Sequence, residues 1–381
     1  MALPKLPQCS PFEQYHVGDI LTLKITPEIS PSRGLLVRVR QLQVPRTLSC
    51  GMVVDILDGD KHEIQSTTAF LKLFDRRFAD QLRDDNAIDP WERDIEEDYI
   101  EFVQSGEVFD LLHDHRYVKD FQEEAEDYWY DAENEAFLAN KLLELYAAET
   151  ATYNALHSYQ GNLIPRLFAA INLDLTPPNA QGEVSRPEEL FQVKGILLQY
   201  IEGFSLSDLQ DRAPRSSWQN IVDQALSIVH VLGDHDILNN DVRPGNFMVS
   251  PKGDGGYHVF MIDLALCRFR GQGESDFVWG LAKYVMDEEG RVGEVMKDRL
   301  GKHGFELNYK RSERYIEWAE REEEEGDLTE EGFKYQYVLP CRVVHSLVPL
   351  PHLQYLVEQR PWHSVLRCVI FFGFLTWSLP E

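Results

Sequence analysis

The chain has 381 residues, of which 43% are apolar and 11% aromatic, so it is long enough to bury one large core or two joined ones. This composition excludes a disordered chain. With 64 acidic and 37 basic residues the formal net charge is -27, which argues against general attraction to nucleic acid or to an anionic membrane.

The first third of the chain predicts β structure. Apolar residues alternate with polar ones over residues 35–40, and apolar stretches at 52–57 and 67–74 predict two further strands. The segment from about 84 to 140 is strongly acidic but carries aromatic residues, which predicts amphipathic helices. Its acids form either a solvated helix surface or a docking surface for a basic protein partner.

Beyond residue 140, strands and helices are predicted to alternate and then give way to a mostly helical part. Strands are expected at 164–168 and 193–201, a loop at 176–188, and helices at 142–157, 206–210, 218–233 and 311–325.

The most informative segment is Asn-Asn-Asp-Val-Arg-Pro-Gly-Asn at 239–246, followed by a predicted hairpin that ends at Asp263. Asp241 is placed to accept a proton from an attacking hydroxyl. Asn246 and Asp263 offer oxygen atoms, which Mg²⁺ prefers as ligands. The spacing therefore predicts a magnesium and phosphate site.

These motifs resemble those of the protein-kinase superfamily, because residues 239–246 stand where kinases carry H-R-D-x-K-x-x-N and Ile262-Asp263-Leu264-Ala265 stands where they carry D-F-G. The pattern looks especially like fungal protein-kinase-like domain proteins, and it is also similar to small-molecule kinases of the aminoglycoside phosphotransferase type.

The resemblance implies roles for further residues. Lys72 would contact the α- and β-phosphates of ATP and Glu149 would hold its ammonium group, while Arg243 would contact the γ-phosphate. Residues Gln199, Tyr200, Ile201 and Glu202 would form the hinge that binds adenine. The implied cofactors are ATP and Mg²⁺.

The resemblance also implies an α+β, two-lobed protein-kinase-like fold. Residues 1–200 would form a β-rich N-lobe with the acidic helical insertion, and residues 201–381 a mainly helical C-lobe with a C-terminal tail of uncertain place. The resemblance covers about 35–280.

The sequence departs from the kinase pattern in three places. Residues 45–51 replace the glycine-rich loop. Asn239 and Asn240 replace the histidine and arginine of the H-R-D motif, and no Ala-Pro-Glu follows Asp263. Two functions therefore stay open. One is a phosphotransferase acting on a hydroxyl acceptor, with a protein favoured over a small molecule. The alternative is a pseudokinase that binds nucleotide or a partner as a scaffold.

The location expected from the sequence is the cytoplasm or nucleus. No apolar run near the start predicts a signal peptide, and the apolar stretch at 365–377 is shorter than a membrane span and contains Arg367. Neither a disulfide framework nor a zinc site is expected from the five scattered cysteines, Cys9, Cys50, Cys267, Cys341 and Cys368.

Overall fold

The computed structural model describes residues 12–26, 34–58, 67–118, 129–175, 190–313 and 317. The chain divides into two compact units, residues 1–84 with 88–325 and residues 85–87 with 326–381. All elements discussed below belong to the first unit, apart from the last residue of α1. The loop predicted at 176–188, most of the helix predicted at 311–325 and the whole C-terminal tail lie outside the described residues.

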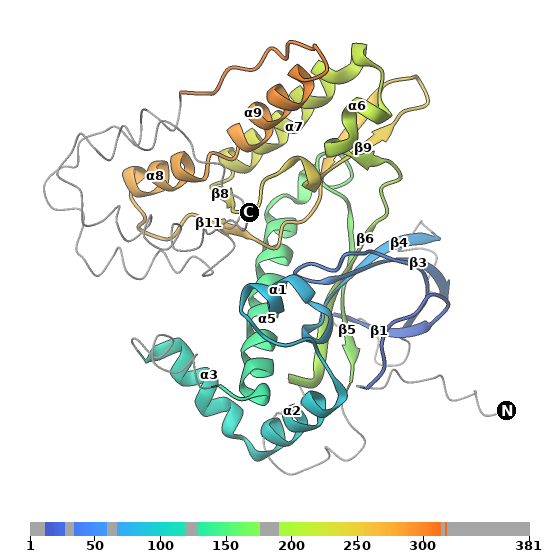
Figure 1. Ribbon diagram of the computed structural model, residues 1–381, viewed down its shortest axis with the longest axis vertical. Helices are drawn as coiled ribbons and strands as arrows, with labels where there is room; N and C mark the ends of the chain where they lie inside the picture. Colours follow the sequence, from blue (N-terminus) through green and yellow to red (C-terminus); the bar gives the residue numbers. More distant parts are fainter. Residues whose placement is uncertain are drawn as a thin grey trace, which may run out of the picture. The chain divides into compact units, whose positions relative to one another are not determined.

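The dominant feature of the first unit is a closed antiparallel β-barrel of order β1-β2-β3-β4-β6-β5 (Figure 1). Its strands are β1 (Ile20–Thr26), β2 (Leu35–Leu42), β3 (Cys50–Asp58), β4 (Thr68–Phe74), β5 (Leu167–Asp174) and β6 (Gln192–Gln199). β1 closes the barrel by pairing with β2 on one side and with β5 on the other.

Alternate residues of each strand fill the barrel interior, as the period of two in a strand requires. On β4, Leu71 and Leu73 are fully buried in this core while Lys72 between them points to the outside. The barrel core consists mainly of apolar side chains that are almost completely buried, among them Leu21, Leu23, Val37, Met52, Val54, Ile171 and Leu197.

The predicted two-lobed protein-kinase-like fold is wrong. The strands predicted in the first third of the chain do form, but they belong to a closed six-stranded barrel. The physical reason is β1, which the sequence reading did not assign: its backbone pairs Lys24 with Asn172 on β5, so neither neighbour keeps a free edge. The predicted division at residue 200 stays a prediction.

The acidic segment is mostly helical where it is described. It begins at the end of α1 (Asp80–Asp85) and contains α2 (Arg93–Ser105), α3 (Glu107–Tyr117) and the first part of α5 (Asp131–Ala155). Helix α5 begins eleven residues before the helix predicted at 142–157, because Glu133 caps the backbone amide of Tyr130 at 2.8 Å.

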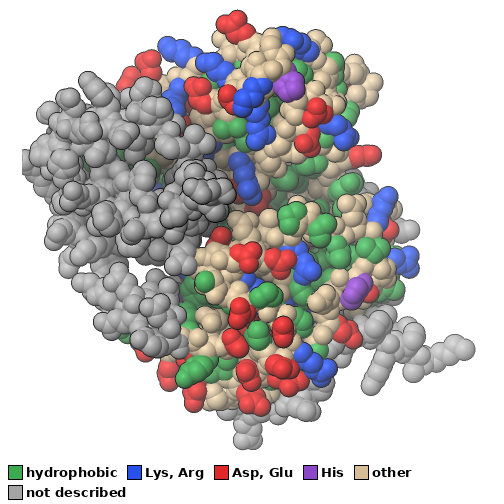
Figure 2. Space-filling view, in the orientation of Figure 1, with side chains coloured by type: hydrophobic (Ala, Val, Ile, Leu, Met, Phe, Trp, Pro, Cys, Tyr) green, Lys and Arg blue, Asp and Glu red, His purple; other side chains and the backbone are tan. Residues whose placement is uncertain are grey.

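Helix α2 is amphipathic, with Tyr99 and Val103 packed in a small core against α5. Its opposite face carries exposed acids, namely Glu92 before its first turn and Asp94, Glu97, Asp98 and Glu101 on the helix. Figure 2 shows acidic side chains gathered on the lower part of the drawn face. The acids of α2 thus lie on a solvent-exposed helix face.

The residues that follow β6 in the chain form helices and short strands. They are β7 (Phe204–Ser205), α6 (Leu209–Arg212), α7 (Trp218–Asp234), β8 (Ile237–Asn239), β9 (Phe247–Pro251), β10 (Tyr257–Met261), β11 (Cys267–Phe269), α8 (Asp276–Met286) and α9 (Gly290–Gly301). The predicted hairpin is confirmed as β9 paired with β10, and the helix predicted at 218–233 as α7. Among the helices of the described residues, none combines the length and apolar character needed to cross a membrane.

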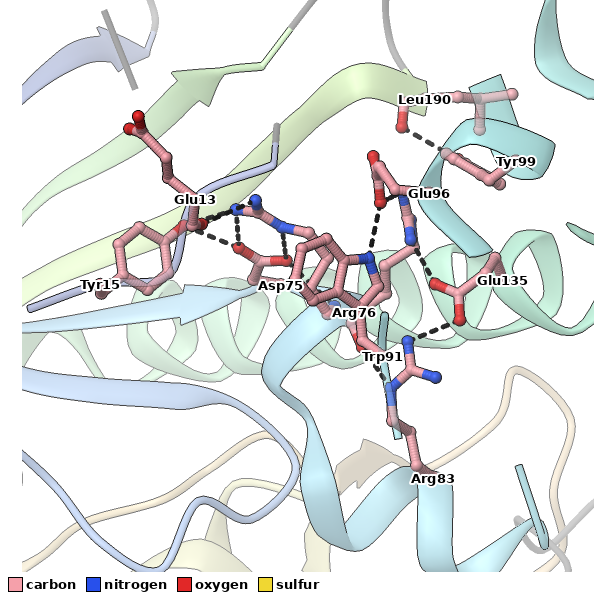
Figure 3. Close-up of polar contacts among 11 residues, drawn as sticks. Glu13, Tyr15, Asp75, Arg76, Arg83, Trp91, Glu96, Tyr99, Glu135 and Leu190 are labelled. Carbon is pink, nitrogen blue, oxygen red and sulfur yellow. Dashed lines mark hydrogen bonds and ion pairs between the residues drawn. The ribbon is translucent and has the colours of Figure 1, made fainter. Parts of the chain in front are cut away.

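A buried network of charged side chains joins the end of β4 to the acidic helices (Figure 3). Arg76 forms ion pairs with Glu135 of α5 and, at 2.7 Å, with Glu96 of α2. Arg83 of α1 reaches the other oxygen of Glu135 at 2.6 Å, and the Trp91 indole donates to Glu96 at 2.8 Å. Glu135 therefore bridges two buried guanidinium groups.

A second buried ion pair lies beside this network. Arg77 contacts both oxygens of Asp75 at 2.7 and 3.0 Å, and the Tyr15 hydroxyl donates to Asp75 at 2.7 Å. Together the two groups contain three arginines and three carboxylates, so their charges balance. Burial of so many charges is tolerated because each has a close partner.

Replacing Glu135 with Gln should destabilise the protein strongly, because it leaves Arg76 and Arg83 buried with too little negative charge. We expect a loss of about 3–5 kcal/mol in the free energy of unfolding, measured by urea denaturation. The matched control is Glu144→Gln on the same helix, whose exposed carboxylate pairs with Lys141 at 3.3 Å; its effect should stay below about 0.5 kcal/mol. Equal effects of the two changes would contradict the importance of the network.

Gly195 of β6 faces the crowded barrel interior, and an added Cβ would lie 2.7 Å from Ile171 and 2.8 Å from both Leu73 and the Lys72 carbonyl oxygen. Gly195→Ala should therefore destabilise by about 1–3 kcal/mol through overpacking. Gly253→Ala, with nothing within 4 Å, is the control and should leave the urea midpoint nearly unchanged. A neutral Gly195→Ala would show that the barrel can expand.

Candidate functional site

The centre of the candidate site is the Lys72 ammonium group. Its Nζ lies 2.7 Å from Glu149 Oε2 and 2.8 Å from Asp263 Oδ1. Lys72 is 7% exposed and Glu149 is fully buried, whereas the Asp263 side chain keeps 27% of its surface exposed. The structure thus brings together three residues that the sequence placed in one site.

Local structure explains how the three meet. Lys72 points out of the barrel because its β4 neighbours point in, and α5 packs against the strands β4 and β6. Glu149, on the last turns of α5, uses its second oxygen to accept the Leu264 backbone amide at 3.4 Å. One carboxylate therefore binds both the barrel lysine and the segment that carries Asp263.

Electrostatic interactions favour the charged forms of Lys72 and Asp263. Burial alone would lower the pKa of Lys72, but Asp263 and Glu149 outweigh it and raise that pKa above its usual value. Burial would raise the pKa of Asp263, yet the Lys72 charge and hydrogen bond hold it below its usual value. For Glu149 burial dominates and its pKa is raised despite Lys72.

A short loop after β8 holds the second group of predicted residues. The Asn246 side-chain amide donates to the Asp241 backbone oxygen at 2.7 Å and to Asp241 Oδ2 at 2.9 Å. Arg243 reaches the same Oδ2 at 3.3 Å, and half of its side chain is exposed. Within the described residues, no hydrogen bond reaches Asp241 Oδ1, so this oxygen is available to an incoming group.

Burial has a larger effect on the pKa of Asp241 than the neighbouring side chains have. Desolvation raises the pKa of its carboxyl group, and the opposing effects of Arg243 and Asn246 do not cancel this rise. A carboxylate with a raised pKa is a stronger proton acceptor than an ordinary aspartate.

Asp263 adopts an unusual backbone conformation. Its φ is 64°, in the left-handed region, which Asp tolerates better than most residues. The amide of Ile262, the preceding residue, donates to the Asn246 carbonyl oxygen at 2.8 Å, which anchors the segment to the Asp241 loop. Strained conformations of this kind cluster at functional sites, and here the strain accompanies the turn that directs the carboxylate toward Lys72.

Asn246 and Asp263 carry oxygen atoms of the type that Mg²⁺ prefers as ligands. The Asn246 amide nitrogen is used by Asp241, and its oxygen Oδ1 accepts only a long contact of 3.4 Å from Arg243. Asn246 and Asp263 would together supply two hard oxygen ligands, leaving the other positions to phosphate oxygens and water. Within the part of the chain that the structure describes, no cluster of three or more His, Cys, Asp or Glu side chains is placed to hold a metal ion.

The predicted hinge begins with Gln199, the last residue of β6, and continues directly after the strand. The Gln199 amide donates to the Arg166 carbonyl oxygen at 2.8 Å, so this group is already used within the chain. Tyr200 is 40% exposed, Ile201 is buried and Glu202 is exposed. Adenine binding by these residues stays a prediction that rests on their position beside β4.

Gly51 does not lie in a phosphate-covering loop. It belongs to β3, pairs with Lys72 across the ladder, and leaves room for the side chains of Gln43 and Phe70. A Cβ at this position would meet the Gln43 amide oxygen at 2.5 Å, so close packing explains why a glycine stands here.

The sequence reading missed the support beneath the Asp241 loop. Glu288 is buried, accepts the Asn239 backbone amide at 2.8 Å and forms an ion pair with buried Lys283. The Asn239 side chain in turn accepts the Asp241 amide at 2.9 Å. Glu288 stands in the run Asp-Glu-Glu-Gly, which by composition is typical of an exposed turn, so no local pattern points to its role.

Comparison with known proteins adds little to this geometry. No protein-family model matches the chain, and no curated protein matches its sequence. Among solved structures 589 chains match, one of them the BubR1 kinase domain, at a TM-score of 0.33 and 11% identity, covering 70% of this chain and 54% of that one. This chain thus spans about half the length of that chain. A likeness at this level establishes neither a shared fold nor a family, and no comparison supports a special closeness to fungal proteins.

A double-mutant cycle tests the Lys72–Glu149 pair. Lys72→Met and Glu149→Gln should each cost about 3–5 kcal/mol of stability, because each leaves a buried charge with too few partners. The double variant should lose less than the sum, with a coupling of about 0.5–3 kcal/mol. The exposed pair of Lys302 and Asp298 is the control, with a coupling expected near 0.3–0.5 kcal/mol, a rough value for surface helix pairs. Additive losses at Lys72 and Glu149 would contradict the ion pair.

Proposed function

We propose that this chain is an ATP- and Mg²⁺-dependent phosphotransferase that moves the γ-phosphoryl group of ATP to a hydroxyl acceptor, the reaction type of protein kinases. The observation that carries the proposal is the placement of Lys72 between Glu149 and Asp263, at 2.7 and 2.8 Å. These partners lie 77 and 191 positions from Lys72 in sequence, so a merely local pairing does not explain the cluster.

Each residue has a defined task in this proposal. Lys72, held by Glu149, would contact the α- and β-phosphates as a fixed cation. Asp263 and Asn246 would hold Mg²⁺, which when bound neutralises charge on the β- and γ-phosphates. Positioning and electrostatic stabilisation of this kind supply most of the catalysis in phosphoryl transfer.

Asp241 would act on the acceptor. Its Oδ1 is available, and its raised pKa favours taking the hydroxyl proton as the acceptor oxygen bonds to the γ-phosphorus and the bond to the β–γ bridging oxygen breaks. Arg243, half exposed beside Asp241, would contact the transferring group. We favour a protein acceptor over a small molecule.

A second candidate function is that of a nucleotide- or partner-binding scaffold. It is favoured by Gly51, which lies inside β3 rather than in a loop over phosphates, and by the Gln199 amide, which is already bonded to Arg166. The partner in this case would be a basic protein that meets the exposed acids of α2.

Saturating Mg²⁺ and ATP should stabilise the protein against thermal unfolding. At about 100 times its dissociation constant a ligand adds about 2.7 kcal/mol. Asp263→Asn should remove the part of this gain that depends on Mg²⁺, because a neutral amide binds the metal more weakly. A shift that is the same with and without Mg²⁺ would contradict the metal assignment.

Transfer itself separates the two functions. Asp241→Asn should retain the stabilisation by Mg²⁺ and ATP but lower the rate of γ-phosphate transfer by about 10²–10⁴-fold, as expected for loss of a general base. The rate is measured as release of ADP with water or a peptide mixture as acceptor. Nucleotide binding with no transfer by the unmodified chain would favour the scaffold.

A further inference from the structure

Arg291 lies at the start of α9, next to the loop that carries Asp241. The anchor is Glu288, whose side chain accepts the Asn239 amide at 2.8 Å, two residues before Asp241. Arg291 follows Glu288 by three residues, about one helical turn, and α9 packs against the 3₁₀ turn Pro244–Asn246 of the same loop. The first turn of α9, which carries Arg291, therefore lies next to the Asp241 loop.

Three carboxylates influence Arg291, but each has a basic partner of its own. Asp241 pairs with Arg243 at 3.3 Å, Glu288 with Lys283, and Asp287 with Arg311. Across the part of the chain that the structure describes, no hydrogen bond or ion pair holds the Arg291 side chain itself. Of the four basic side chains in this group, Arg291 is thus the one without an ion-pair partner among the described residues.

The Arg291 side chain is also partly removed from water. Arg291 is neither fully exposed nor fully buried, and desolvation lowers its pKa although the three carboxylates oppose this effect. A guanidinium group offers five donors in a planar fork that matches a phosphate or a carboxylate. An unpaired, partly buried arginine beside an available proton acceptor is suited to bind an anionic ligand.

We infer that Arg291 binds an anionic group on the acceptor, so that the hydroxyl presented to Asp241 belongs to a substrate that carries a phosphate or carboxylate nearby. This inference rests on the proposed function and specifies its substrate class. It assigns Arg243 and Arg291 to different tasks: Arg243, which contacts Asn246 at 3.4 Å, serves the transferring group, and Arg291, on the first turn of α9, serves the acceptor. Arg291 is a specificity-determining residue that touches the substrate.

Inorganic phosphate and acetate serve as probes for this site. Thermal unfolding is measured with Mg²⁺ and a non-hydrolysable imido analogue of ATP, whose own γ-phosphoryl group fills the transfer position, at constant ionic strength set with chloride. Phosphate, acetate or both should stabilise the unmodified protein further, and the stronger probe identifies the anion. Arg291→Gln should weaken that binding by about 10–100-fold, the worth of one charge-assisted hydrogen-bonded contact.

Two further variants serve as controls. Arg299→Gln makes the same change two turns further along α9 and should leave anion binding unchanged. Arg291→Lys keeps the charge and should retain part of the binding, which separates lost recognition from lost folding. Anion binding that is equal in Arg291→Gln and the unmodified protein, or absent from both, would overturn the inference.

The same experiment distinguishes this inference from the proposed function. If the ATP analogue gives no shift but Arg291-dependent anion binding persists, the anion site stands and the phosphotransferase proposal fails. If the analogue binds with Mg²⁺ and no anion effect depends on Arg291, the substrate inference fails and the phosphotransferase proposal stands.

Discussion

The arrangement of this unit depends on the ion pairs that the Lys72 ammonium group forms with Glu149 and Asp263. A buried cation is costly unless carboxylates surround it, and here those carboxylates come from α5 and from the segment after β10. The barrel, the long helix and the Asp241 region must therefore adopt one relative position to satisfy a single side chain. The alternation of β4 directs that side chain outward, so the barrel core and the polar cluster follow from the same strand.

Helix α5 is fixed to the barrel at two points. Glu149 binds Lys72, and Glu135, fourteen residues earlier and about 21 Å away along a straight helix, binds Arg76 just after β4. Two ion pairs on one strand–turn segment prevent the helix from rotating or sliding independently. Helix α2 also helps to hold α5 on the barrel, because its Glu96 pairs with Arg76. The acidic segment therefore has a structural role as well as an exposed acidic face.

Short-range patterns in the sequence predicted the β9–β10 hairpin and helix α7. Lys72 and Glu149 were assigned through the resemblance to kinases, and the structure brings them together with Asp263. Barrel closure was missed because the pairing of β1 with β5 joins residues far apart in the chain, which no local period encodes. Glu288 was missed for a similar reason, because a short acidic run is typical of an exposed turn and only long-range packing buries it.

Closure of the barrel also limits how this chain can meet other proteins. Every strand from β1 to β6 has two hydrogen-bonded neighbours, so the barrel offers no backbone edge to which an extended peptide could add as an extra strand. The same property prevents edge-to-edge association of two copies through these strands. In the described chain, strands with only one strand neighbour are found in the small sheets, namely β7 and β10 in one and β8 and β11 in the other. Recognition at the barrel must therefore use side chains and the surface they form.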